Sequence, residues 1–477
     1  MLEHANDAAS SSTTEAGLGA QPLSPLDGRY RGAVSGLSEH LSEAGLNRAR
    51  VHVEVEWLRH LTERRMFGVA PMSAAQVATL RAAATDFGAA EIAELAELEA
   101  TTRHDVKAVE YFVRRRLEIV GLGSISELTH FAATSEDINN LAYALTVKAA
   151  VMDVWRPRLV TVIEALRSLA LEHRDAPMLA RTHGQPATPT TMGKELAVFV
   201  HRLDRLLTKL DQQEYLGKFN GATGTYAAHL SAAPDVDWQE ASREFVTSLG
   251  LDWNPLTTQI ESHDWQAELY GTVVHIGRVL HNLCTDVWTY ISLGYFRQIP
   301  VPGATGSSTM PHKVNPIRFE NAEANLEISA SILDGLAASL VVSRLQRDLT
   351  DSTTQRNIGV GLGHSLLALD NIVRGLREIA LAPEVLAADL DRNWEVLAEA
   401  IQTVVRAEVA AGNSTIANPY ELLKELTRGR RVDGRAMAEF IDRLDISAAA
   451  KTRLQQLTPN NYTGIASELV DLIAESR

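Results

Sequence analysis

The sequence predicts an all-α protein built around a bundle of long helices. Several stretches repeat apolar residues every three or four positions, which is the spacing that lines one face of a helix. Stretches that alternate apolar and polar residues, as strands do, are scarce. Five of the periodic stretches are long and are joined by loops rich in motifs, and this combination is typical of a helix bundle.

The five long stretches share wide apolar faces, and one of them contains a proline. Pro157 lies inside the first stretch and is expected to kink that helix. Their apolar faces are wide and rich in alanine, so we expect close helix–helix contact on more than one side and a subunit interface. A monomeric helical array is the alternative. The stretches cover residues 141–166, 192–210, 269–291, 317–336 and 355–376.

The remaining parts of the chain divide into smaller units around this bundle. Residues 1–20 are polar and small, without a basic start and apolar core, so we expect a flexible tail and not a secretory signal. Shorter helices are predicted for an N-terminal domain, residues 21–124, before the bundle domain, residues 125–378. From about residue 380 short helices broken by Asn-Pro and Thr-Pro predict a small C-terminal domain, residues 379–477.

The composition excludes several classes of protein. With 45 Lys and Arg against 60 Asp and Glu, the net charge is −15, which argues against a general nucleic-acid binder. The single cysteine, Cys284, excludes an intramolecular disulfide framework and fits a reducing cytoplasm. No apolar run is long enough to span a membrane. An anionic ligand would therefore have to be bound by a local cluster of Arg and Lys.

Two glycine-rich motifs are interpreted as structural. Gly359–Gly363 resembles a nucleotide-binding loop, but no predicted strand precedes it, so we expect close helix packing by small residues. "FNGATGTY", Phe219–Tyr226, lacks the Gly-Lys-Ser/Thr of a phosphate-binding loop. There is no His-Glu-x-x-His, and no pair among the 15 histidines has convincing metal spacing, so no catalytic metal is expected.

One loop carries an unusual density of functional residue types. It reads "GSSTMPHKVNP", Gly306–Pro316, and Asn315-Pro316 predicts a helix start with Asn as the cap and Pro in the first turn. The loop would then lie at the positive end of a long helix, with Lys313 adding a full charge and the glycines allowing closure over a ligand. This arrangement suits a carboxylate, or the dianion formed when a proton leaves the neighbouring carbon. An ordinary surface loop is the alternative.

The same loop resembles the signature loop of the fumarase/aspartase superfamily, whose members eliminate fumarate from succinyl-type substrates. Further segments resemble the adenylosuccinate lyase family of that superfamily, and they cover nearly the whole chain after residue 20. They are "SPLDGRY" (24–30), "TTRHDVKAVEYF" (101–112), "HFAATSEDINN" (130–140), "RTHGQPATP" (181–189), "TTQIESHD" (257–264) and "SRLQRDLTDST" (343–353).

The resemblance implies a reaction and an assembly. The reaction would be β-elimination of fumarate from adenylosuccinate, giving AMP, and from the succinylated imidazole carboxamide ribotide of purine biosynthesis, without a cofactor. The assembly would be a homotetramer with a 20-helix core, in which three subunits contribute to each active site. Two alternatives stay open: another lyase of the superfamily, such as argininosuccinate lyase, which has no nucleotide phosphate to bind, and a structural protein that kept the fold.

The resemblance also implies catalytic residues. Ser307 would be the general base, in an environment made positive by Lys313 and the helix start. His183, in a proline-bounded loop before a helix, would be the general acid with Glu320 as its carboxylate partner. His104 would be a second histidine near the phosphate and the leaving group. The plainer alternatives are a substrate hydrogen bond for Ser307, a solvated first-turn glutamate for Glu320 and a structural role for His104.

The implied substrate-binding residues combine cations for a phosphate with polar groups for the fumarate half. Arginine suits phosphate through its forked donors. Thr134 and Ser135 match contacts to the fumarate half, and Thr134 and Asp137 also have capping-box spacing. Arg103 stands where the close bacterial pattern has Asn. The full set is Arg29, Tyr30, Arg103, Asp105, Thr134, Ser135, Gln259, Ser308, Asn315, Asn321, Arg347, Ser352 and Arg356.

Overall fold

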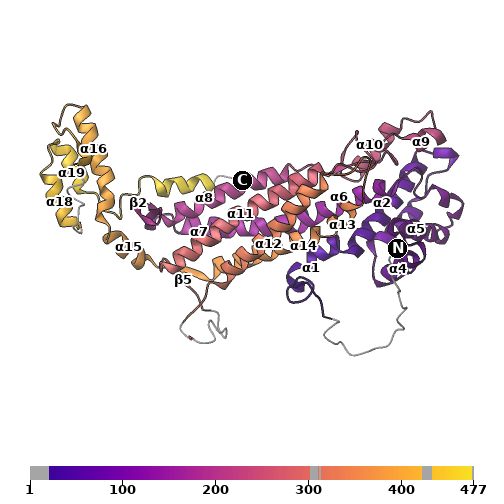
Figure 1. Cartoon of the computed structure of the whole chain (residues 1–477), viewed down its shortest axis with the longest axis horizontal. Helices are drawn as coiled ribbons and strands as arrows, with labels where there is room; N and C mark the ends of the chain where they lie inside the picture. The colour runs from indigo at the N-terminus through magenta and orange to yellow at the C-terminus, as the bar shows by residue number, and fades with distance from the viewer. Residues whose placement is uncertain (1–20, 301–309, 311–312, 422–431, 475–477) are drawn as a thin grey trace.

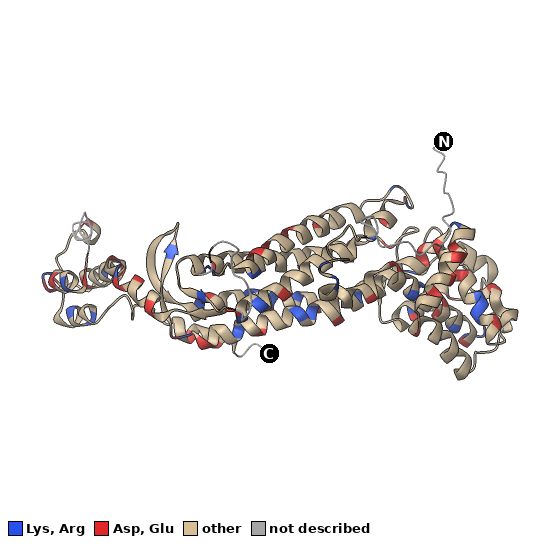
Figure 2. Ribbon diagram, turned by 90° about the horizontal axis from the view of Figure 1, so that it is seen from below, with Lys and Arg blue, Asp and Glu red and all other residues tan. Residues whose placement is uncertain are grey.

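The protein is elongated, with a central bundle of long helices and smaller groups of helices at its two ends (Figure 1). The computed structural model describes residues 21–300, 310, 313–421 and 432–474. Over these residues no helix combines the length and apolar character needed to cross a membrane. Acidic and basic residues are distributed along the bundle and in the helical groups at both ends (Figure 2).

The five predicted long stretches are all helical, which confirms the all-α fold class. The first stretch is continuous but contains a π-helical turn, Ala150–Trp155, which ends two residues before Pro157, so the expected disturbance takes the form of a wider turn. Trp155 anchors this turn because its indole nitrogen donates to the Ser365 hydroxyl at 2.9 Å. The bundle helices are α6 (Ser135–Ala149), α7 (Arg156–Glu172), α8 (Met192–Asp211), α11 (Asp264–Ser292), α12 (Ile317–Leu340) and α14 (Ile358–Arg377).

Glycines allow α14 to pack closely against its neighbours. A Cβ atom added at Gly361 would lie 2.7 Å from Cδ2 of Leu333 on α12, and one added at Gly363 would lie 2.9 Å from Cδ1 of Leu26. Both distances are far below ordinary contact, so a side chain at either position would displace a neighbour. The interpretation of Gly359–Gly363 as a packing motif is therefore confirmed.

The N-terminal group is joined to the bundle through a helix that is buried on several sides. On α2, Val51 and Leu58 pack into an N-terminal core, whereas Val53 and Trp57 pack into the core of the bundle. The Trp57 indole also donates to the Phe131 carbonyl at 3.1 Å. The group consists of α1 (Arg31–Leu41), α2 (Glu43–Glu63), α3 (Ala74–Thr85), α4 (Ala89–Thr102) and α5 (Asp105–Ile119).

The C-terminal helices form a separate small core, but the end of the described chain does not belong to it. Val470 and Ile473 are buried in the core of the bundle. Asp471 accepts from Arg174 at 2.8 Å, next to the end of α7. The separate core is formed mainly by α16 (Ala398–Ala410), α18 (Gly434–Asp442) and α19 (Ala448–Gln455), with α15 (Pro383–Asp391) before them and α20 (Ala466–Leu469) after them.

A few short strands position the loops. β1 (Pro177–Thr182) and β2 (Gln185–Thr191) form an antiparallel hairpin, so the proline-bounded segment with His183 is not simply a loop before a helix. His183 and Gly184 form its turn with φ of 53° and 74°, the left-handed pair that two-residue hairpins favour. β3 (Leu216–Gly217) pairs with β4 (Asp252–Trp253), and β5 (Phe296–Gln298) with β6 (Ile379–Leu381). Three further short α-helices are α9 (Ala227–Ala232), α10 (Trp238–Ser248) and α13 (Thr350–Gln355).

A buried histidine in α9 predicts how stability depends on pH. His229 is 0% exposed between aromatic rings, and neither ring nitrogen has a hydrogen-bond partner within the described part of the chain. Burial lowers the pKa of His229 to about 4, from 6.5 for an ordinary histidine. The unfolded chain therefore binds the extra proton between pH 6.5 and 4, and the free energy of unfolding falls as the pH drops through that window.

We expect His229→Phe to reduce this acid loss of stability, because it removes one of the groups that take up a proton on unfolding; burial also lowers the pKa of His60 to about 4. Urea unfolding at pH 7.5, 6 and 5 measures the slope. His201→Gln, at an exposed histidine of α8, is the control and should retain the wild-type slope. An unchanged slope in His229→Phe would contradict the assignment.

Candidate active site

The predicted site residues belong to several parts of one chain. His183 lies at the hairpin turn, and Lys313 lies before α12. Gln259 lies before α11, and its backbone N–H donates to the side chain of Gln346, which places Arg347, the next residue, in the same region. The helix α11 has 29 residues and spans roughly 43 Å, and it runs from the Gln259 group toward the strand that precedes the signature loop. One chain therefore does not bring the Gln259 group and Lys313 together. Ser307 and Ser308 lie outside the described residues.

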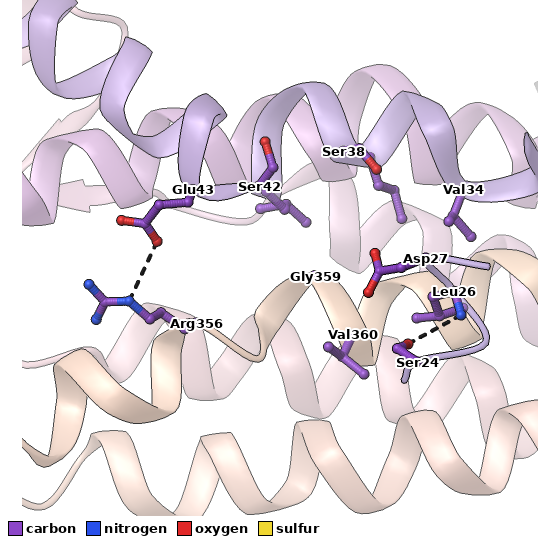
Figure 3. Close-up of a pocket in the computed structure, with 12 residues that line it drawn as sticks. Ser24, Leu26, Asp27, Val34, Ser38, Ser42, Glu43, Arg356, Gly359 and Val360 are labelled. Carbon is purple, nitrogen blue, oxygen red and sulfur yellow. Dashed lines mark hydrogen bonds and ion pairs between the residues drawn. The ribbon is translucent and has the colours of Figure 1, made fainter. Parts of the chain in front are cut away.

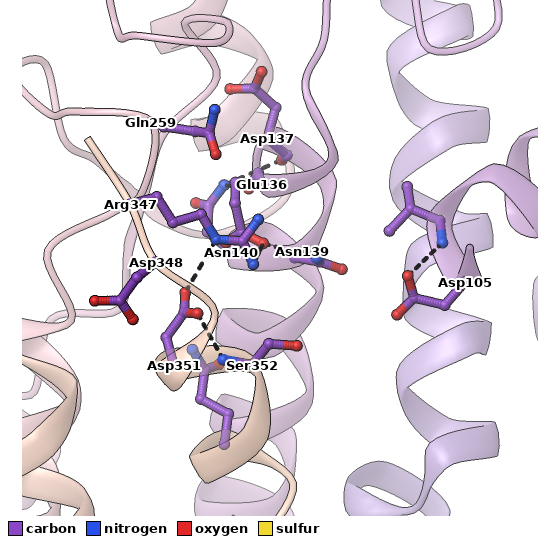
Figure 4. Close-up of polar contacts among 12 residues, drawn as sticks. Asp105, Glu136, Asp137, Asn139, Asn140, Gln259, Arg347, Asp348, Asp351 and Ser352 are labelled. Atoms are coloured by element: carbon purple, nitrogen blue, oxygen red, sulfur yellow. Dashed lines mark hydrogen bonds and ion pairs between the residues drawn. The ribbon is translucent and has the colours of Figure 1, made fainter. Parts of the chain in front are cut away.

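The largest group is centred on Arg347. Its guanidinium bonds to Glu136 at 2.9 Å, and its Nε lies 3.6 Å from Asp351 (Figure 4). Burial raises the pKa of Glu136 although Arg347 opposes the shift. For Asp351 burial also acts upward, but the contacts of His263 and Arg347 outweigh it and lower the pKa. Arg347 is therefore already paired with two carboxylates of its own chain, so a phosphate ligand would have to share it.

A buried ion pair holds the start of α6. Lys218 Nζ lies 2.9 Å from Asp137 Oδ1, and both side chains are 0% exposed. Asp137 also accepts from the backbone N–H groups of Thr134 at 2.8 Å, Asn220 at 2.9 Å and Gly221 at 3.1 Å. The loop that carries the "FNGATGTY" glycines thus binds a carboxylate of this chain, and the bond to Thr134 confirms the capping interaction. The role of Lys218 was not predicted.

Asp105 connects α5 with two arginines. Arg50, which is 1% exposed, donates to Asp105 at 2.8 Å and to Asn139 of α6 at 2.9 Å. Arg356 approaches Asp105 at 3.6 Å and Glu43 at 3.5 Å. The pKa of Asp105 is lowered because the arginines and a backbone N–H outweigh the upward effect of burial. Arg356 also lines a cavity of about 260 Å³ between α1 and α14 (Figure 3).

His104 has a structural role that its position explains. It is the N-cap of α5, and its Nδ1 accepts the backbone N–H of Lys107 at 3.3 Å. Its side chain is 51% exposed, so the ring can also contact a ligand. Arg103 directly before it has φ of 52°, a left-handed conformation that Asn tolerates more readily than Arg. The structural alternative for His104 is thus present and does not exclude ligand contact.

The helix after the signature loop begins one residue later than expected. α12 starts at Ile317, and Pro316 occupies the cap position without a side-chain cap, so Asn315 does not cap this helix. The Pro316 carbonyl instead accepts from Glu320 N–H at 3.3 Å, which is the first α-helical hydrogen bond of α12. Glu320 lies in the first turn and accepts from the Trp288 indole at 3.1 Å. No hydrogen bond or ion pair joins Glu320 to His183 within the described chain.

A partly buried pair of a histidine and a glutamate, His130 and Glu54, was not predicted from the sequence. His130 Nδ1 lies 2.6 Å from Glu54 Oε1, and the backbone N–H of His130 donates to Glu54 Oε2 at 3.0 Å. Burial alone would lower the pKa of His130, but the hydrogen bond and charge of Glu54 outweigh burial and raise it. The pair lies beside the start of α6. The only sequence signal was that His130 begins the segment "HFAATSEDINN".

Comparison with known families places the chain in a class of lyases. A family model described as "Lyase" matches residues 28–328, and one described as "Adenylosuccinate lyase C-terminal" matches residues 343–463. The chain belongs to the adenylosuccinate lyase family.

Similar proteins agree with this assignment. The chain is 49% identical to adenylosuccinate lyase of Escherichia coli (strain K12) over 94% of this chain and 98% of that protein. It is 46% identical to adenylosuccinate lyase of Legionella pneumophila (strain Corby) over 94% of this chain and 97% of that protein. Among solved structures, a fumarate lyase from Mesorhizobium sp. BNC1 has a TM-score of 0.72 at 20% identity, covering 93% of this chain and 98% of that chain. That last likeness concerns the fold alone.

Proposed function

We infer that the protein is a carbon–nitrogen lyase that cleaves adenylosuccinate into AMP and fumarate. The observation that carries this inference is the 49% identity with an adenylosuccinate lyase along 94% of the chain. The same elimination would apply to the succinylated imidazole carboxamide ribotide, because both substrates carry a succinyl group on nitrogen. The enzyme would act in the cytoplasm.

The proposed mechanism is an anti β-elimination. Ser307 takes the proton from the carbon next to a carboxylate, and the electron pair of that C–H bond becomes the carbon–carbon double bond of fumarate. The C–N bond breaks, and His183 gives a proton to the leaving nitrogen. Lys313 and the start of α12 stabilise the dianion that forms between these events. The elimination requires neither an oxidant nor a reductant.

We propose a homotetramer in which three subunits contribute to each active site. The separation of the Gln259 group from Lys313 along α11 supports this assembly, because one chain does not bring these residues together. Large apolar side chains are also exposed on the bundle: Trp288 is 43%, Ile328 45% and Ile317 58% exposed. A subunit interface would cover such residues. The division into an N-terminal, a bundle and a C-terminal domain belongs to the same proposal.

The decisive experiment is the ultraviolet absorbance change of the purified protein mixed with adenylosuccinate. Conversion to AMP and fumarate is the expected result. A folded tetramer without conversion would contradict the proposed function and favour argininosuccinate or aspartate as substrate, or a scaffold role.

Nucleotide binding gives an independent check. AMP should raise the thermal unfolding temperature, whereas an argininosuccinate enzyme or a scaffold should show no such shift.

A further inference from the structure

A polar cavity of about 350 Å³ lies between the segment before α1, the start of α12 and the end of α14. Its lining includes the predicted substrate residues Arg29, Tyr30 and Asn321, together with Arg318 and Arg374. One carboxylate, that of Asp370, lines the same cavity. In a chain with a net charge of −15, three arginines against one carboxylate make a local positive site.

The charges in this cavity are not equally available to a ligand. Asp370 is paired with Arg158 at 2.8 Å, and Arg318 is paired with Glu378 at 3.3 Å. Arg374 is exposed in the last turn of α14 and has no side-chain hydrogen bond or ion pair within the described residues. Its charge can therefore be directed at a bound anion without loss of an existing bond.

The other polar groups are arranged to act with Arg374. The guanidinium of Arg29 lies over the ring of Tyr30, 5.8 Å from its centroid, and makes no ion pair with a described carboxylate. The side-chain oxygen of Asn321 accepts from Asn371 at 2.9 Å and from Asn325 at 3.1 Å. This orientation leaves the amide nitrogen of Asn321 as a donor. Two arginines and an amide N–H are a suitable donor set for a phosphate.

We propose that Arg374 is a further substrate-binding residue, which holds the phosphate monoester of the nucleotide together with Arg29 and Asn321. The proposal rests on the proposed function and extends it to a residue that lies outside every motif quoted above. It also explains how a phosphate can be bound although Arg347 is already engaged by Glu136 and Asp351.

The test compares Arg374→Gln with Arg377→Gln in the full-length protein. Arg377 is exposed three residues further along α14 and does not line the cavity, so it is a matched control for loss of surface charge. Binding of AMP and of adenosine, which lacks the phosphate, is measured by calorimetry. We expect Arg374→Gln to bind AMP about tenfold more weakly or worse, with adenosine binding unchanged and Arg377→Gln like wild type.

Three results would overturn the inference. Unchanged AMP affinity in Arg374→Gln would show that the side chain does not contact the phosphate. An equal loss for AMP and adenosine, or an equal loss in Arg377→Gln, would show a general effect on structure or charge. If the wild-type protein cleaves adenylosuccinate and Arg374→Gln keeps its AMP affinity, only this inference is wrong. If the wild-type protein neither cleaves adenylosuccinate nor binds AMP, the proposed function is wrong as well.

Discussion

Ser307→Ala should lower kcat about 10³-fold while AMP affinity stays within about twofold of wild type. A general base interacts with the reacting proton mainly in the transition state, so its removal affects the rate much more than ground-state binding. Steady-state kinetics with adenylosuccinate and calorimetric titration with AMP measure the two quantities separately.

The control for this variant is Thr309→Val, because Thr309 lies in the same loop and has no assigned role. A Ser307→Ala enzyme with a rate near wild type would disprove the base assignment. A parallel loss of rate and AMP affinity would instead support the alternative that Ser307 only hydrogen-bonds the substrate.

Mixing two inactive variants should restore activity if the sites are shared between subunits. His183 lies on the β1–β2 hairpin and His104 at the start of α5, and β2 and α5 lie at opposite ends of the molecule (Figure 1). His104→Asn and His183→Ala should each be nearly inactive. In a random 1:1 mixture, one site in four receives both native residues from different subunits, so about a quarter of the wild-type rate is expected.

Replacing His104 by asparagine removes the imidazole but keeps a side chain that can cap α5, so a loss of activity is not caused by loss of the helix cap. His104 caps α5 through its ring nitrogen, and asparagine is a favoured N-cap, so the variant should keep the helix start. Each variant incubated with itself under the same conditions is the control. Native mass spectrometry that shows mixed tetramers without recovered activity would contradict shared sites.

The helices could be predicted because their signal is local. Apolar residues at helical spacing mark α8, α11, α12 and α14 in the sequence, and neither a ligand nor a partner is needed to recognise that pattern. The hairpin around His183 was missed because its strands are short and contain three prolines, residues that strands usually avoid. The start of α12 was misplaced by one residue, which is the usual uncertainty of a helix boundary.

Several site interactions were beyond sequence reasoning because their partners are far apart in the chain. His130 and Glu54 are separated by 76 residues, and Glu54 lies in helix α2 whereas His130 lies in a turn before α6. Lys218 would be read as a surface residue from its type alone, yet it is fully buried against Asp137. A buried charge needs a partner, and the identity of that partner depends on how helices cross.

The sequence by itself determined the helical class, the family and the residue types that carry the chemistry, because helical periodicity and a long continuous motif are properties of neighbouring positions. Only the tertiary structure decided which charges are free for a ligand. Arg347 and Arg374 look alike in the sequence, but packing places Arg347 between Glu136 and Asp351 and leaves Arg374 in an open cavity beside Arg29. The difference arises from the crossing of α6, α12 and α14, which sets distances between residues that no local pattern relates.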